Sequence, residues 1–190
     1  MNLLHRWLCS SSRWQRTVEQ HVLPWALEGV NLGSRVLEVG PGYGATTTLL
    51  QRRVAQLTCV EVDPKLAEDL RRRNPGENVA IRCEDATKMS FPDASFDGAV
   101  CFTMLHHVAS AKLQNQLLAE VARTLRPGGV FAGTDSLDSR FFRLLHVRDT
   151  LVPVDPATFS ARLEAVGFEN VHVDVNPYAF RFRAYKPLEN

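Results

Sequence analysis

The stretch that decides the fold of this chain is Val36-Leu37-Glu38-Val39-Gly40-Pro41-Gly42-Tyr43-Gly44. A short apolar run that ends at a glycine is typical of a buried strand, which we predict over residues 36–40. The glycines that follow let the backbone turn sharply and allow a ligand to come within contact distance. A helix is expected directly after the turn, over residues 44–55, and its N-terminus offers N–H groups and a partial positive charge. The stretch therefore predicts a strand, a ligand-binding turn and a helix.

Short apolar runs and helical patterns alternate along the rest of the chain. Further strands are expected over residues 57–62, 79–83, 96–102 and 130–134, and further helices from Pro64, over 110–125, and from Pro156 to near Gly167. This alternation predicts an α/β fold with a mostly parallel sheet and helices on both faces. Two alternating runs around Pro177 predict a C-terminal β-hairpin. Ligands of such sheets bind outside the carboxyl ends of the strands.

The chain of 190 residues has the length of one domain. We expect a helical lid segment over residues 1–30, a ligand-binding core over 34–135, an insertion over 136–155, and a C-terminal helix with its hairpin over 156–186. The insertion is too long for an ordinary connection and too apolar for disorder, so it is expected to fold over a ligand.

The composition excludes several classes of protein. A formal net charge of +1 argues against a nucleic-acid backbone as the main partner. No apolar stretch reaches the roughly 18 to 20 residues that span a bilayer. Arg6 and the serines at 10–12 interrupt any signal-peptide core, so we expect a cytoplasmic protein without a membrane partner. Cys59, Cys83 and Cys101 lie in apolar runs and are expected as buried thiols, and no cysteine has metal-ligand spacing.

Acidic residues follow the glycine-rich turn at informative distances. Glu38 precedes Gly40 by two positions, where a phosphate-cradling loop would not favour a carboxylate, and the loop lacks the Gly-Lys-Ser/Thr of a P-loop. Glu61 closes the second strand, where an acidic residue accepts hydrogen bonds from ribose hydroxyls. We expect Asp63 to cap the next helix and to leave Glu61 available. Asp85 follows the third strand, where a carboxylate accepts from an adenine amine.

Together with Phe96–Val100 and Leu125–Gly129, these blocks occur in an order that resembles the small, Rossmann-like class I S-adenosylmethionine-dependent methyltransferases of the methyltransferase-11/25 kind. The resemblance covers residues 34–186. It implies a doubly wound, three-layer α/β/α fold whose seven-stranded, mostly parallel sheet has an antiparallel last strand. It also implies S-adenosylmethionine as cofactor and no metal. The donor-binding residues that it implies are Glu38, Gly40, Gly42 and Gly44 for the methionine part, Glu61 for the ribose, Asp85, Ala86, Val62 and Met89 for the adenine, and Phe102 near the sulfonium.

Two other functions stay open. The run from Gly40 to Ala45 also fits the Gly-x-Gly-x-x-Ala fingerprint of an NAD(P)-dependent oxidoreductase, with Glu61 about 20 residues further on. A non-catalytic donor-binding module would carry the same residues. Within the methyltransferases, the run Phe102–Leu105 lacks the motifs of nucleobase and arginine methylases. A small-molecule O-, N- or C-methyltransferase is therefore expected.

The acceptor side is predicted from weaker signals. His106 and His107 follow the fourth strand and either pack the loop or remove a proton from the acceptor as a general base. Proximity and alignment alone also support methyl transfer from a sulfonium. Asp135, Asp138 and His146 are weaker candidates on the same rim. The residues expected to contact the acceptor are Phe141, Phe142, Tyr178 and Trp7.

Overall fold

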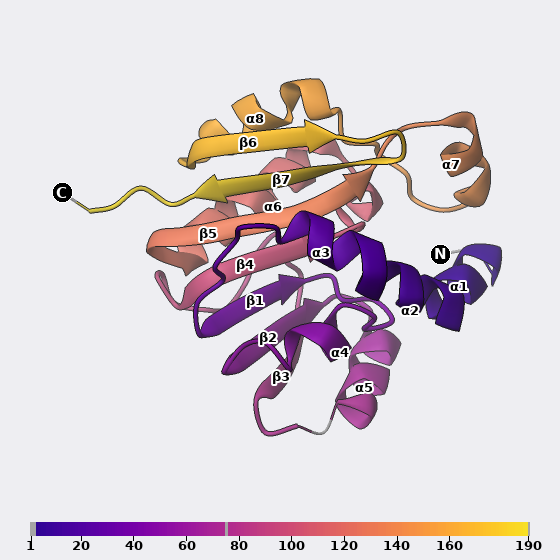
Figure 1. Ribbon diagram of the computed structural model, residues 1–190, viewed down its shortest axis with the longest axis horizontal. Coiled ribbons are helices and arrows are strands. Elements are labelled where there is room, and N and C mark those ends of the chain that lie inside the picture. Colours follow the sequence, from indigo (N-terminus) through magenta and orange to yellow (C-terminus); the bar gives the residue numbers. More distant parts are fainter. Residues whose placement is uncertain (1–2, 75, 190) are drawn as a thin grey trace.

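The protein is described by a computed structural model that covers residues 3–74 and 76–189, the first three of these by their backbone alone. Seven strands form one sheet in the order β3-β2-β1-β4-β5-β7-β6 (Figure 1). The strands are β1 Arg35–Val39, β2 Gln56–Glu61, β3 Val79–Cys83, β4 Phe96–Phe102, β5 Leu125–Ser136, β6 Glu169–Val175 and β7 Ala179–Tyr185. The pairs among β1 to β5 are parallel, and β7 is antiparallel to both β5 and β6. The predicted doubly wound sheet with an antiparallel last strand is confirmed.

Helices cover both faces of the sheet and give the three layers. They are α1 Leu3–Ser10, α2 Ser12–Thr17, the π-helix η1 Val18–Val22, α3 Leu23–Ala26, α4 Thr47–Leu50, α5 Pro64–Arg73, the 3₁₀ turn η2 Leu105–His107, α6 Ala111–Thr124, α7 Arg140–Leu145 and α8 Pro156–Glu164. Strand alternation divides the core in two. Val36 faces a cluster with α3, α4 and α5, whereas Leu37 and Val39 face a larger cluster with α6 and α8.

Two elements differ in length from the prediction. The helix expected over 44–55 is reduced to the four residues of α4, because the hydroxyls of Thr46 and Thr47 turn inward to bond Glu38. Threonine in such a run competes with helical hydrogen bonding. The fifth strand spans 125–136 instead of 130–134, since Leu125 already pairs with Phe96 before a register shift and the far end pairs with β7.

The N-terminal segment consists of four short helical elements, α1, α2, η1 and α3. The side chain of Ser11 accepts from the N–H of Trp14 and restarts the helix as α2. Residues 1–2 of the expected segment lie outside the described residues. Downstream, the guanidinium of Arg181 stacks over the ring of Trp25 at 5.4 Å and anchors α3 to β7. The segment thus runs from the sheet toward the carboxyl ends of the parallel strands, where α7 also lies (Figure 1).

The cysteine prediction was wrong at one position. Cys59 and Cys101 are buried free thiols, but Cys83 is exposed because β3 is an edge strand. Among the residues that the structure describes, no helix is long and apolar enough to cross a membrane.

Candidate active site

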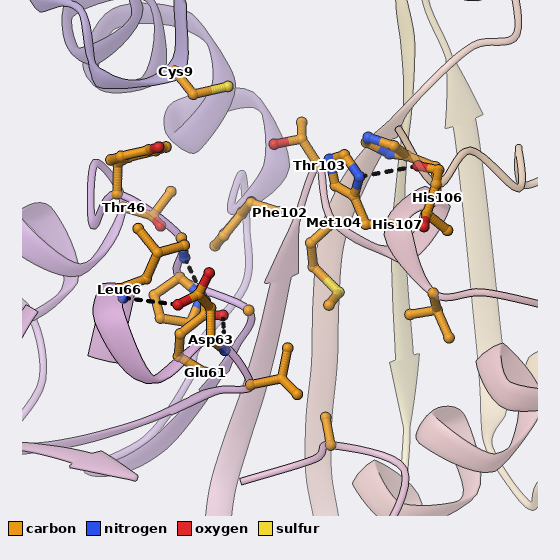
Figure 2. Close-up of a pocket in the computed structure, with 18 of the residues that line it drawn as sticks. Cys9, Thr46, Glu61, Asp63, Leu66, Phe102, Thr103, Met104, His106 and His107 are labelled. Carbon is orange, nitrogen blue, oxygen red and sulfur yellow. Dashed lines mark hydrogen bonds between the residues drawn. The ribbon is translucent and has the colours of Figure 1, made fainter. Parts of the chain in front are cut away.

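A cavity of about 610 Å³ opens at the carboxyl ends of the parallel strands. One side, here called the strand-end half, consists of the loops after β1, β2 and β3 (residues 40–46, 60–63 and 84–87). The other side, the covering half, comes from the N-terminal helices, the loop after β4, and α7 with its C-terminal turn. Its lining residues are Leu8, Cys9, Trp14, Val18, Val22, residues 102–104 and 106–109, Leu113, Leu117, Ser136, Phe142, Leu145, His146 and Thr150. Figure 2 shows Glu61 and Asp63 on one side of this cavity and His106 and His107 on the other.

The three glycines of the turn all have positive φ, but each has a different surrounding. A Cβ atom added at Gly40 would lie 2.6 Å from Met104, and one added at Gly44 would lie 2.6 Å from Leu70. At Gly42, with φ +53°, the added atom would meet nothing within 4 Å. Gly42 and Gly40 line the cavity, whereas Gly44 lets the turn pack on α5. Gly42 is therefore the position where a ligand can approach the backbone most closely.

Glu38 lies behind the turn and does not line the cavity. Its carboxylate is buried and accepts from the hydroxyl of Thr47 at 2.7 Å, from Thr46, and from the thiol of Cys59 at 3.3 Å. Burial raises the pKa of Glu38, and the hydroxyl hydrogen bonds oppose that rise. Strand alternation places Glu38 on the same face as Val36, toward α4. The threonine that it holds, Thr46, is the residue that reaches the cavity wall.

Glu61 ties two loops of the strand-end half together. Its carboxylate accepts from the N–H of Gly42 and from the N–H of Asp63, both at 3.0 Å. Burial raises the pKa of Glu61. Asp63 caps α5 by accepting from the N–H of Lys65 at 2.8 Å, as predicted, but the expectation that Glu61 would be unengaged was wrong. Each carboxylate oxygen keeps a second lone pair, so Glu61 retains capacity for a ligand hydroxyl.

The other predicted donor residues divide between the cavity wall and the core. Val62, Asp85, Ala86 and Phe102 line the cavity. Asp85 is exposed and accepts from the N–H and the hydroxyl of Thr87, both at 2.8 Å. Met89 is buried among core residues and does not line the cavity.

His106 and His107 both line the covering half. The Nδ1 atom of His106 lies 2.5 Å from Oδ1 of Asp135, and its backbone N–H donates to Oδ2 at 3.1 Å. Both residues of this pair are buried. His146, a weaker candidate in the sequence, lies against both histidines at ring-centroid distances of 5.0 and 5.2 Å.

Only one of the four predicted acceptor contacts lines the cavity. Phe142 does, and its ring packs 4.9 Å from that of His106. Phe141, Trp7 and Tyr178 are 69%, 67% and 83% exposed and do not line it. Sequence reasoning missed Leu8 and Cys9, which line the cavity from α1.

The fold and this cavity define a class of protein. A doubly wound sheet with a glycine turn after β1 and a carboxylate at the end of β2 is a nucleoside-binding architecture of the Rossmann type. Residues 37–133, half of the chain, match the family described as "Methyltransferase domain". The protein belongs to this family, the class I S-adenosylmethionine-dependent methyltransferases. Nothing in the comparisons favours an oxidoreductase.

The names of its relatives indicate different methyl acceptors. The demethylmenaquinone methyltransferase of Tropheryma whipplei is 30% identical over 73% of this chain and 61% of its own length. The fatty-acid O-methyltransferase of Mycolicibacterium smegmatis is 37% identical over 55% of this chain and 38% of its own. A probable ribosomal RNA small subunit methyltransferase A of Thermococcus onnurineus is 43% identical over 30% of this chain and 21% of its own. The chain thus spans less than two thirds of the length of these relatives.

Solved structures share the fold. A methyltransferase solved in complex with the Haloferax volcanii Trm112 methyltransferase activator superposes with a TM-score of 0.76 at 16% identity, over 98% of this chain and 99% of that one. At this identity the similarity supports the architecture alone.

Proposed function

We propose that the protein transfers the methyl group of S-adenosylmethionine to a small, largely apolar acceptor. The observation that carries the proposal is one continuous cavity, in which the strand-end half meets the largely apolar chamber of the covering half. Two ligands that occupy its two halves lie in contact with each other. Such proximity is the main requirement of a direct displacement.

The strand-end half suits the chemistry of the donor. S-adenosylmethionine carries an ammonium, a carboxylate and a sulfonium but no phosphate. A turn flanked by carboxylates therefore suits this ligand better than it suits a dinucleotide. We assign the ribose hydroxyls to Glu61, the adenine amine to Asp85, and the methionine part to the turn at Gly42. The open space above Gly42 supports this assignment, because a Cβ there would occupy it.

The covering half suits an apolar acceptor. Leu8, Trp14 and Val18 face the cavity from the N-terminal helices, and Phe142 and Leu145 face it from α7. A chamber lined in this way binds by burial of apolar surface. Two relatives act, by their names, on demethylmenaquinone and on a fatty acid, which fits such an acceptor.

The reaction needs few groups of the protein. S-adenosylmethionine supplies the methyl group, whose carbon bonds to the acceptor atom as its bond to sulfur breaks and the electron pair stays on the sulfur. The chain holds both ligands in line and excludes water. That His106 or His107 takes a proton from the acceptor stays a prediction, and for His106 it requires Nε2, since Nδ1 is engaged by Asp135.

The test has two steps. Calorimetry with S-adenosylhomocysteine should show one site per chain. The protein is then incubated with methyl-labelled S-adenosylmethionine and separate pools of long-chain carboxylic acids, phenols and structured RNA. We expect label in the acids or phenols. Label in RNA alone would overturn the acceptor class, and a failure to bind S-adenosylhomocysteine would overturn the donor assignment.

A further inference from the structure

Three histidines from two separate segments meet in the covering half. His106 and His107 lie in η2, and His146 follows α7. The ring centroids of His106 and His107 are 4.2 Å apart, and one ring nitrogen from each of the three residues lies within 4.8 Å of the others. We propose that these imidazoles bind one divalent transition-metal ion, with an open coordination position that faces the cavity.

The hydrogen bonds of the three rings prepare the same nitrogen for a metal. Nδ1 of His106 meets Asp135, Nδ1 of His146 lies 2.7 Å from the carbonyl oxygen of Phe142, and Nδ1 of His107 lies 3.3 Å from that of Thr150. A carbonyl or carboxylate oxygen only accepts, so each Nδ1 is the donor. In a neutral imidazole the lone pair is then on Nε2, which is the ligand atom.

This arrangement is the one that metal-binding histidines use. Their second N–H donates to a carboxylate or to a backbone carbonyl, which fixes the orientation of the ring and raises its basicity. Asp135 supplies the carboxylate from β5 and is fully buried.

The donor set selects the kind of ion. Three imidazoles suit Zn²⁺, Fe²⁺, Co²⁺, Ni²⁺ or Cu²⁺, whereas Mg²⁺ and Ca²⁺ require oxygen ligands. Three protein ligands with a fourth position for water or substrate are typical of catalytic zinc sites.

Binding of one ion would bring the three ring nitrogens closer together. Nitrogens on a tetrahedral Zn²⁺ are about 3.3 Å apart for metal–nitrogen bonds of about 2.0 to 2.1 Å. The longest separation, at most 4.8 Å, therefore shortens by up to about 1.5 Å. No residue of α7 itself is buried, so this short helix can shift without disrupting the core.

The open coordination position indicates which chemical class of acceptor binds there, and this step alone rests on the proposed function. A metal ion lowers the pKa of a hydroxyl bound to it. A phenol, an enol or a carboxylic acid would bind as its anion and release its proton to water. The oxygen then bonds to the methyl carbon while the carbon–sulfur bond breaks and the electron pair remains on sulfur.

The experiment uses the full chain and metal ions alone. Protein stripped with a chelator is titrated with Co²⁺, followed by visible absorption, and the Zn²⁺ retained after dialysis is measured by mass spectrometry. We expect about one ion per chain, nitrogen-ligand bands for Co²⁺, and no competition by Mg²⁺. Metal should also slow proteolysis within residues 140–150.

Matched variants locate the site. His146→Gln should weaken Co²⁺ binding by more than about 100-fold, and Asp135→Asn by about 10- to 100-fold, the range for a residue that orients a ligand. His172→Ala and Cys83→Ser, which remove exposed ligands elsewhere, should leave it unchanged. S-adenosylhomocysteine calorimetry on each sample reports whether the protein is folded and the donor site intact.

The outcomes separate the two proposals. Protein that binds S-adenosylhomocysteine but retains no ion, or whose His146→Gln variant binds Co²⁺ as tightly as the parent, overturns the metal site and leaves the proposed function standing. Protein that binds Co²⁺ through His146 but does not bind S-adenosylhomocysteine supports the metal site and overturns the donor assignment.

Discussion

The two halves of the cavity are built in different ways. The strand-end half comes from three short loops whose shape depends on the backbone: positive φ at Gly40 and Gly42, and a Glu61 carboxylate that binds two backbone N–H groups. The covering half consists of side chains from η2, α7 and the N-terminal helices. These segments lie far apart in the sequence, and two of them, α2 and α7, contain no buried residue.

This difference indicates that the two halves have different roles in binding. A backbone-built site anchored to parallel strands keeps its geometry when side chains elsewhere change, which suits a ligand common to the whole family. A half built from side chains on short helices can change its lining without affecting the sheet, which suits an acceptor that differs among relatives. Substitutions in one half should therefore leave binding in the other half unchanged.

The largest effect is expected at Gly42. Gly42→Val places a branched side chain in the open space above the turn and forces it into a left-handed conformation. Affinity for S-adenosylhomocysteine should fall by at least about 100-fold, or about 2.8 kcal/mol, measured by calorimetry. Gly167→Val is the matched control, because Gly167 also has positive φ and open space but lies outside the cavity. Equal losses in both variants would mean that strain, not occupied space, is responsible.

The next effect concerns the carboxylates of the strand-end half. Glu61→Ala and Asp85→Ala should each weaken S-adenosylhomocysteine binding by about 1 to 3 kcal/mol, the value of hydrogen bonds to charged groups. Glu68→Ala removes the same charge from the exposed face of α5 and should have no effect in the same calorimetric titration. Unchanged affinity in both test variants would contradict the assignment of this half to the donor.

Neighbouring phenylalanines test the covering half. Phe142→Ala removes an aromatic ring from the cavity wall and should raise the acceptor KM about 10-fold, since each 1.4 kcal/mol of lost burial changes affinity tenfold. Phe141→Ala removes an exposed ring from the same helix and should leave KM unchanged. Affinity for S-adenosylhomocysteine should be the same in both. A weaker donor affinity in Phe142→Ala would show that the halves are coupled.

The smallest effect is expected on stability, behind the glycine turn. Burial raises the pKa of Glu38, so the folded protein holds this proton more tightly than the unfolded chain does. The corresponding stabilisation is complete below the ordinary glutamate pKa of about 4.3 and is lost as the pH rises through the raised pKa. Glu38→Gln cannot lose a proton. The free energy of unfolding, measured with urea at about pH 5 and at about pH 8, should therefore fall less between the two pH values in the variant than in the parent.

Exposed glutamate supplies the reference for that measurement. Glu68→Gln, on the surface of α5, should follow the parent at both pH values. An equal change in unfolding free energy in Glu38→Gln and in the parent would mean that the pKa of the Glu38 carboxyl is the same in the folded and unfolded chain.

The sequence by itself determined the fold and most of the strand-end half. The alternation of strands and helices, the C-terminal hairpin, the glycine turn and the Asp63 cap follow from patterns a few residues long, because alternation, turns and caps act between near neighbours. The antiparallel last strand followed from the family resemblance, and the strand order came from the structure. The same patterns placed Glu61 and Asp85 at the ends of β2 and β3, where parallel strands bring them to one edge.

Only the tertiary structure decided the covering half. One residue along a helix rotates the side chain by about 100°, so Phe142 and Leu8 face the cavity while Phe141 and Trp7 face solvent. The meeting of His146 with His106 and His107 depends on how α7 packs against the end of β4, which no local pattern specifies. Contacts between segments far apart in the chain depend on how whole elements pack, so they can be identified only in the folded structure.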